Sequence, residues 1–244
     1  MSDSERVLLE HGFVLHQRAY RNTSQLLECE TVEHGRVGLV ARGSRRAASG
    51  QRALLQPFVP LRLSWAKRGE LGRLTQVEAA AASCELVGQH LLAGYYANEL
   101  LLRLTARDDP NPKVFSCYSR CLAELADCAP VARTMRIFEM SLLEALGYGL
   151  ELDSDVATGE PLRAERSYAY EAEHGLRATV FGDRDPDADV FSGRELISLR
   201  EHVLDDDDSL RAAQRLLGRV LRLYLGERPL KSRLVLQDIV RRGL

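Results

Sequence analysis

The chain has 244 residues, of which 45% are hydrophobic and 28% charged, and its formal net charge is −2. This composition is ordinary for a globular protein and excludes a collagen-like or low-complexity chain. The sequence has no apolar run of the roughly 18 residues that a membrane span needs, and its first residues lack the basic and apolar regions of a signal peptide. We therefore expect a cytoplasmic protein.

Residues 6 to about 78 are predicted to form β structure. Apolar or alternating runs at 13–18, 26–32, 36–42, 56–66 and 71–77 predict about five short strands, with a hairpin turn at Glu33–Gly35. Residues 43–51 are predicted to be a loop, and Pro57 and Pro60 indicate an edge or a bend. About five strands in some 75 residues suit a small closed barrel of the OB type.

From about Glu78 to Gly147 the pattern changes to helix. Ala79–Ala82 is predicted to begin the first helix, in which apolar residues recur at three- and four-residue spacing as far as Leu104. The Pro-containing stretch Asp108–Pro112 ends it. Two further helices are predicted at about 112–126 and 129–147, and the three together predict a helical bundle.

The remainder is predicted to be mixed. Residues 168–171 and 174–181 indicate a small hairpin, Ser192 begins a short helix, and the acidic run Asp205–Asp208 opens a longer one, where acids suit the positive helix N-terminus. We expect an α+β multidomain protein. Its predicted domains are an OB-type barrel at 1–78, a helical domain at 79–150 and a small mixed C-terminal domain at 151–244 that packs on the others.

Basic residues are concentrated between Arg36 and Arg73, where nine face a single acid, Glu70. A folded, locally basic β module is typical of proteins that bind the phosphate backbone. The alternative is a solvated arginine-rich sheet face. Trp65 and Tyr20 either stack on bases beside these arginines or pack within the barrel.

Charge also alternates near the C-terminus. Residues 183–208 carry ten acids and three arginines, and residues 209–244 carry nine basic residues and two acids. Arg211, Arg215, Arg219 and Arg222 share one face of the predicted helix. That stripe either faces solvent or contacts phosphates.

Enzyme signatures are missing from the sequence, which has no nucleophile elbow, phosphate-binding loop, dinucleotide-binding turn or His-Glu-x-x-His motif. We therefore expect a protein that is not an enzyme and needs no cofactor. Cys117 and Cys121 share a helical face, but zinc needs two further close ligands. We interpret Cys117, Cys121 and Cys128 as core residues and predict no metal site.

The order of several short strings resembles the RecO family of bacterial DNA repair and recombination mediators over residues 6 to 235. The strings that carry the resemblance are Gly12–His16, Thr23–Ser24, Glu33–Val37, Ala41–Gly43, Leu55–Phe58, Gly94–Leu100, Arg136–Glu139, Leu146–Gly149, Tyr224–Gly226 and Pro229–Arg233. Some members carry two cysteine pairs that bind zinc after the helical domain. This chain has no cysteine beyond Cys128, so that site cannot be carried over.

The resemblance implies an OB domain, a helical domain, a smaller C-terminal domain and a role without catalysis. It also implies partners: single- and double-stranded DNA, the C-terminal tail of single-stranded-DNA-binding protein, RecR and, indirectly, RecA. From it we expect a monomer without membrane contact, associated with the nucleoid, that anneals complementary strands. The competing hypothesis is a protein–protein adaptor whose basic regions meet acidic partners.

Two sets of site residues are predicted. The DNA-binding residues are Arg36, Arg42, Arg45, Arg46, Arg52, Lys67, Arg68, Lys231 and Arg233. For the acidic partner tail, the resemblance implies Arg136, and its helical spacing adds Arg133 and Met140. The alternative is that both arginines only face solvent.

Overall fold

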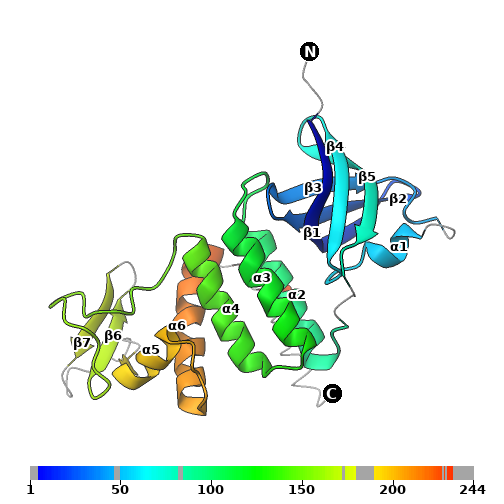
Figure 1. The fold of residues 1–244 in the computed structure, drawn as a ribbon. Coiled ribbons are helices and arrows are strands. Elements are labelled where there is room, and N and C mark those ends of the chain that lie inside the picture. The colour runs from blue at the N-terminus through cyan, green and yellow to red at the C-terminus, as the bar shows by residue number, and fades with distance from the viewer. Residues whose placement is uncertain are drawn as a thin grey trace. The chain divides into compact units, whose positions relative to one another are not determined.

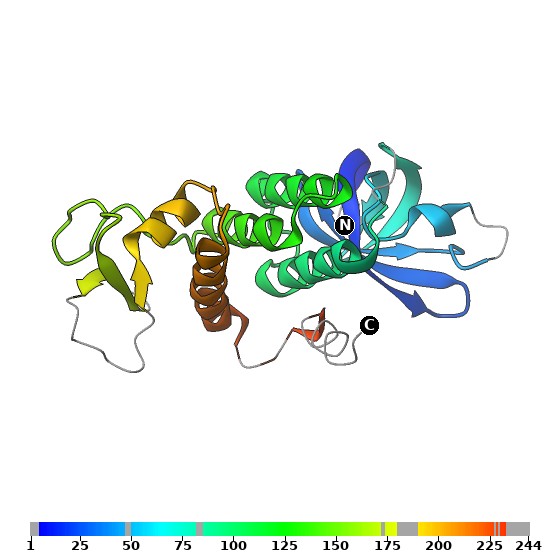
Figure 2. The ribbon, with the colours of Figure 1, turned by 90° about the horizontal axis from the view of Figure 1, so that it is seen from below.

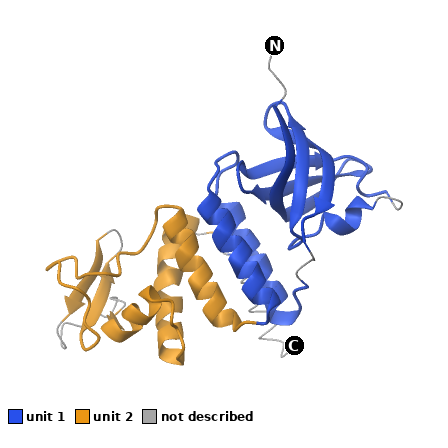
Figure 3. Ribbon diagram, viewed as in Figure 1, with its two compact units in different colours: residues 1–128, 229–244 blue, residues 129–228 orange. Residues whose placement is uncertain are grey.

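The computed structural model describes residues 5–46, 50–81, 85–171, 174–179, 190–226, 228 and 230–232. The chain divides into two units, residues 1–128 with 229–244 and residues 129–228 (Figure 3). This division groups the barrel with the helices that follow it, so the predicted boundaries at 78 and 150 stay a prediction. In the described part of the chain, no helix is long and apolar enough to cross a membrane.

The first unit begins with a closed five-stranded barrel (Figure 1). Its strands are β1 (Glu5–Tyr20), β2 (Ser24–Thr31), β3 (Gly35–Ala41), β4 (Leu61–Lys67) and β5 (Leu71–Ala79). They follow the order β1-β2-β3-β5-β4, β4 pairs back with β1, and the β3–β5 pair is parallel. Inward side chains such as Leu27, Leu39, Leu63 and Trp65 fill the interior. The predicted OB-type barrel is confirmed.

Strand β1 closes the barrel because it pairs with two neighbours along its length. Its first half pairs with β4 and its second half with β2, and the register shifts between Val7 and Glu10 and again between Val14 and His16. Such bulges bend a strand and increase its twist, which a closed barrel of short strands requires.

Three predicted boundaries were wrong. The strand expected from residue 13 begins at Glu5. The strand expected from residue 56 begins at Leu61, because Pro57 and Pro60 lack the N–H that a central strand must donate. The helix expected from Ala79 begins at Gly88. The Ala80 N–H donates instead to the Pro60 carbonyl at 2.8 Å and extends the β4–β5 pairing, so tertiary context overrides the helix propensity of alanine.

The described residues of the first unit also form three helices, α1 (Gln51–Leu54), α2 (Gly88–Leu104) and α3 (Pro112–Ala126). The short α1 was not predicted. Helix α3 begins where predicted, because the Asn111 side chain accepts the N–H groups of Lys113 and Val114 and Pro112 occupies the first turn. Helices α2 and α3 pack side by side (Figure 2).

The second unit contains α4 (Val131–Ala145), a sheet in the order β7-β6-β8, α5 (Gly193–Arg200) and α6 (Asp207–Leu225). Its strands are β6 (Ser167–Glu171), β7 (Gly175–Thr179) and β8 (Val190–Ser192), of which β8 was not predicted. A capping box between Ser192 and Glu195 opens α5. Asp206 caps α6 by accepting the Ser209 N–H at 2.9 Å, which confirms the predicted role of the acidic run.

Candidate nucleic-acid interface

The end of the barrel formed by the β1–β2 turn and the loop after β3 has a fixed backbone. The Arg45 N–H donates to the Thr23 carbonyl at 3.0 Å, and the Arg46 N–H donates to the Gly43 carbonyl at 3.1 Å. The buried Ser44 hydroxyl donates to the Ala41 carbonyl at 3.0 Å. Gly43 has φ +72°, a conformation that glycine adopts without strain. The arginines of this loop therefore project from a defined turn.

Five exposed arginines lie on this turn pair and on α1, and we call them the basic end. They are Arg21, Arg42, Arg45, Arg46 and Arg52. Among the described residues, none of the five is in an ion pair with a carboxylate. Side-chain amides connect α1 to the strands. The Gln56 side chain donates to the Arg52 carbonyl of α1 at 2.8 Å and accepts from Gln17 of β1 at 2.9 Å, and Gln17 accepts from Gln25 of β2 at 2.5 Å.

Lys67 and Arg68 lie at the other end of β1 from the basic end. Lys67 pairs in register with Glu5, whereas the β1–β2 turn follows Tyr20 at the far end of the same strand. The Lys67 side chain is in an ion pair with Asp108, and Arg68 is exposed in the β4–β5 turn. The structure therefore does not bring these two predicted residues together with Arg42, Arg45, Arg46 and Arg52.

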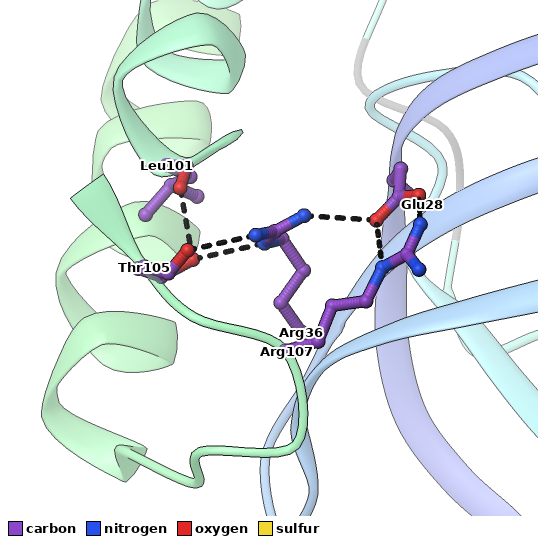
Figure 4. Close-up of polar contacts among 5 residues, drawn as sticks. All are labelled: Glu28, Arg36, Leu101, Thr105 and Arg107. Atoms are coloured by element: carbon purple, nitrogen blue, oxygen red, sulfur yellow. Dashed lines mark hydrogen bonds and ion pairs between the residues drawn. The ribbon is translucent and has the colours of Figure 1, made fainter. Parts of the chain in front are cut away.

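Arg36 is held inside a network of polar side chains (Figure 4). Its guanidinium donates to the Glu28 carboxylate at 2.9 Å and to the Thr105 carbonyl at 2.8 Å, and the side chain is 15% exposed. Arg107 binds the same carboxylate, and this hydrogen bond raises the pKa of the Arg107 guanidinium. Arg36 is therefore already paired with a carboxylate of the protein, which it shares with Arg107.

The segment that returns to the first unit near the C-terminus is bound by α2. Glu99 accepts the N–H groups of Lys231 and Ser232, each at 2.8 Å. Burial opposes ionisation of Glu99, but these hydrogen bonds outweigh it and leave the carboxyl pKa below its ordinary value. The Lys231 side chain is exposed. Arg233 lies outside the described residues.

The residues predicted for the acidic tail lie on α4 and differ in their surroundings. Arg133 donates to the carbonyls of His202 and Val203 at 2.8 and 2.9 Å and so fixes the turn between α5 and α6. Arg136 donates to the fully buried Glu139 carboxylate at 2.6 Å, and its side chain is 15% exposed. Met140 is buried. Arg136 is therefore aligned by a carboxylate one turn along its own helix.

Burial decides whether Trp65 packs within the barrel or can stack on bases, and side-chain contacts show which residues of the arginine stripe have partners within the protein. Trp65 is 2% exposed and meets the His34 ring edge-on, so it packs within the barrel. Tyr20 is half-buried, with the Arg21 guanidinium 5.2 Å from its ring centre. In the stripe, Arg211 pairs with Asp208 and Arg215 lies over the Phe191 ring, so these two cations already have partners.

The face of α6 opposite the stripe is apolar and buried. Its buried apolar residues are Ala212, Ala213, Leu216, Leu217, Val220 and Leu221. Near the end of the helix, Tyr224 is 44% exposed and stacks on the Tyr148 ring with centroids 3.9 Å apart.

The cysteines were interpreted correctly except for Cys128. Cys117 and Cys121 are buried on α3, and burial raises the pKa of the Cys117 thiol to about 12. Cys128 is exposed, because it lies past the end of α3 with φ 58°. The described residues include no group of three or more His, Cys, Asp or Glu side chains that could hold a metal ion.

Sequence reasoning missed Arg21 and the partners of Arg36. Arg21 lies before the block of basic residues in the chain and joins it only because the β1–β2 turn bonds to the loop after β3. Glu28 and Arg107 are 79 residues apart, and no local pattern links them. The turn residues Asn22-Thr23-Ser24 were the available signal for Arg21.

An OB-type barrel whose loop end carries unpaired arginines belongs to the class of folds that bind nucleic acids. Comparison with known proteins agrees. Residues 6–82 match the family model for the Recombination protein O N terminal, and residues 87–234 match the model for the Recombination protein O C terminal.

Curated relatives match almost end to end. The chain is 44% identical to DNA repair protein RecO of Methylococcus capsulatus over 95% of this chain and 93% of the relative. It is 40% identical to DNA repair protein RecO of an Azoarcus species over 98% of this chain and 99% of the relative. It is 43% identical to DNA repair protein RecO of Nitrosococcus oceani over 98% of this chain and 96% of the relative. The chain belongs to the RecO family, and its role lies in DNA repair and recombination.

Proposed function

We propose that the protein is a recombination mediator that binds single- and double-stranded DNA through the basic end and anneals complementary strands. With RecR it would help to load RecA onto DNA coated by single-stranded-DNA-binding protein, without catalysing a reaction itself. The observation that carries the proposal is the basic end: five exposed arginines on a fixed backbone with no described carboxylate paired to them.

The mechanism of binding is electrostatic. Arginines that are free of protein acids displace the counterions condensed on phosphates, and this release drives binding without regard to base sequence. A surface that neutralises the phosphates of two strands lowers their mutual repulsion, so complementary bases can pair. Arg36 and Lys67 are left out of this contact set because each is already bound to a carboxylate of the protein.

A second part of the proposal places the acidic partner tail at Arg136. A guanidinium has five N–H donors, and the bond to Glu139 uses one of them. The others can bind a second carboxylate in a planar, two-point arrangement. Arg133 is left out, because its guanidinium already holds the turn at His202 and Val203.

The test is a salt titration of the affinity for a labelled single strand. If all five arginines contact phosphates, the logarithm of the affinity should fall with the logarithm of salt with a slope of about −3 to −4. The double reversal Arg45→Glu and Arg46→Glu should lower the slope by about 1.4 and weaken binding for every sequence tested. A flat salt dependence in the wild-type chain would favour the adaptor hypothesis instead.

A matched control reverses the same charge elsewhere on the barrel. Arg6 and Arg62 are exposed on β1 and β4, where their strands pair with one another, and neither belongs to the basic end. Arg6→Glu with Arg62→Glu changes the net charge by the same amount. If both double variants lose affinity equally, overall charge rather than the basic end sets DNA binding.

A further inference from the structure

The segment between α2 and α3, residues 105–111, lies along β3 as a short extra strand, and we call it the strap. Strand β5 pairs with β3 at Gly38, Leu39 and Val40. The start of β3 pairs with β2 on one edge, and on the other edge, which β5 does not reach, the Asp108 N–H donates to the Arg36 carbonyl at 2.9 Å and Arg36 and Arg107 form a parallel bridge. The strap thus extends the pairing along this edge of β3 beyond β5, in the manner of an added strand.

Two glycines of β3 permit this close approach. A Cβ atom at Gly35 would lie 2.1 Å from the Asp109 carbonyl oxygen, and one at Gly38 would lie 3.1 Å from the Arg107 guanidinium carbon. Any larger residue at Gly35 would push the strap away from the strand. The contact is therefore built into the sequence of β3 as well as into the strap.

Side chains hold the strap at three points, of which Figure 4 shows those at Thr105 and Arg107. Glu28 of β2 binds Arg107 of the strap, and Arg36 of β3 donates to both the hydroxyl and the carbonyl of Thr105. Lys67 at the end of β4 pairs with Asp108. The Asp108 carboxylate of the strap thus pairs with the Lys67 ammonium group, which could otherwise bind a phosphate.

The strap lies over residues of β2 and β3, the two strands whose face binds nucleic acid in OB-type barrels. Each cation there has a carboxylate partner: Arg36 and Arg107 share Glu28, and Lys67 has Asp108. A phosphate gains little from a cation that already has a carboxylate partner, because counterion release requires a free charge.

We propose that the strap closes a latent phosphate-binding subsite, with the Asp108 carboxylate standing in for a phosphate at Lys67. Lys67 is thereby kept from DNA while the strap is in place. Any change that withdraws Asp108 opens Lys67 to the DNA backbone. The inference rests on the proposed DNA binding and adds to it an autoinhibitory contact and the residue that makes it.

The experiment measures the salt-dependent affinity of Asp108→Asn for a labelled single strand. One additional phosphate contact should tighten binding by roughly threefold to tenfold at low salt and steepen the slope by about 0.7. The control Asp109→Asn removes the same charge from the neighbouring residue of the strap. It should change the affinity less than about twofold, because among the described interactions Lys67 pairs with Asp108 and not with Asp109. The double variant Asp108→Asn with Lys67→Met should lose the gain in affinity for the single strand.

Acylation footprinting of Lys67 by mass spectrometry gives a second readout. The oligonucleotide should protect Lys67 in the Asp108→Asn variant and leave its reactivity unchanged in the wild-type chain. Unaltered affinity and protection in Asp108→Asn would overturn the inference, and so would a gain of equal size in Asp109→Asn or one that survives Lys67→Met. A wild-type chain without salt-dependent binding would instead overturn the proposed function.

Discussion

Asn98 on α2 is expected to be a major contributor to the stability of the first unit. Its side-chain N–H₂ donates to the Leu15 carbonyl at 2.9 Å, and its carbonyl oxygen accepts the Tyr118 hydroxyl at 2.6 Å. Leu15 is the bulged residue of β1, with no partner of its own in the register with β2. Asn98 therefore satisfies a carbonyl that the strand ladder leaves free and connects β1, α2 and α3 through buried atoms.

The substitution Asn98→Ala should lower the free energy of unfolding by about 2–4 kcal/mol. The change leaves two buried groups, the Leu15 carbonyl and the Tyr118 hydroxyl, without the bonds they make now, and each such loss costs about 1–3 kcal/mol. Urea unfolding can be followed by the fluorescence of Trp65, the only tryptophan and a core residue of the barrel.

Two controls sharpen that measurement. Gln89→Ala changes an exposed residue of the same helix and should cost less than about 0.5 kcal/mol. Tyr118→Phe removes one of the two bonds, and the loss in the double variant with Asn98→Ala should be smaller than the sum of the single losses, because both changes break the same bond. A loss below about 0.5 kcal/mol for Asn98→Ala would refute the reasoning.

Three further outcomes are expected. Arg136→Ala should weaken binding of the acidic tail peptide by about 1–3 kcal/mol in calorimetry, while annealing of bare DNA stays close to wild type; equal damage to both would contradict the proposed division between α4 and the barrel. Burial raises the pKa of the Glu30 carboxyl to about 7, and Arg36 opposes this shift in part. Because the folded pKa exceeds the unfolded value of 4.5, the free energy of unfolding should fall by up to about 3 kcal/mol as pH rises from below 4.5 past 7. Glu30→Gln should flatten that pH profile in urea titrations, and a profile unchanged by the substitution would rule Glu30 out as its source. Treatment with a chelator should leave fold and annealing intact, and stoichiometric zinc in elemental analysis would contradict the core interpretation of Cys117 and Cys121.

The sequence predicts the barrel well because its signal is local. Apolar and alternating runs indicate all five strands, although not every boundary, and the hairpin turn at Glu33–Gly35 follows from its glycine, which has φ +61°. Asn111 and Pro112 likewise fix the start of α3 within their own neighbourhood. The failures arise where a distant partner decides the outcome. Ala80 joins a strand ladder through the Pro60 carbonyl, and the propensity of its alanine-rich neighbourhood cannot reveal that bond.

The candidate site shows the same difference between what local sequence predicts and what a distant partner decides. Sequence reasoning found the cluster of cations between Arg36 and Arg73 but missed Arg21 and could not tell which cations already have a carboxylate partner. The cations on strands, Arg36 and Lys67, are covered by the strap and have only 15% and 14% of their side chains exposed. A charge so far removed from water needs an opposite charge beside it, and a carboxylate from Glu28 or Asp108 supplies one.

The cations in loops are under no such constraint. Arg42, Arg45 and Arg46 remain in water, so they need no internal partner and stay available to an external anion. Burial, which a sequence does not display, therefore sorts equivalent arginines into those that hold the fold together and those that can hold DNA. It follows that charge reversal should be tolerated by the fold at Arg45 and Arg46, whereas at Arg36 it would set two carboxylates against each other beneath the strap.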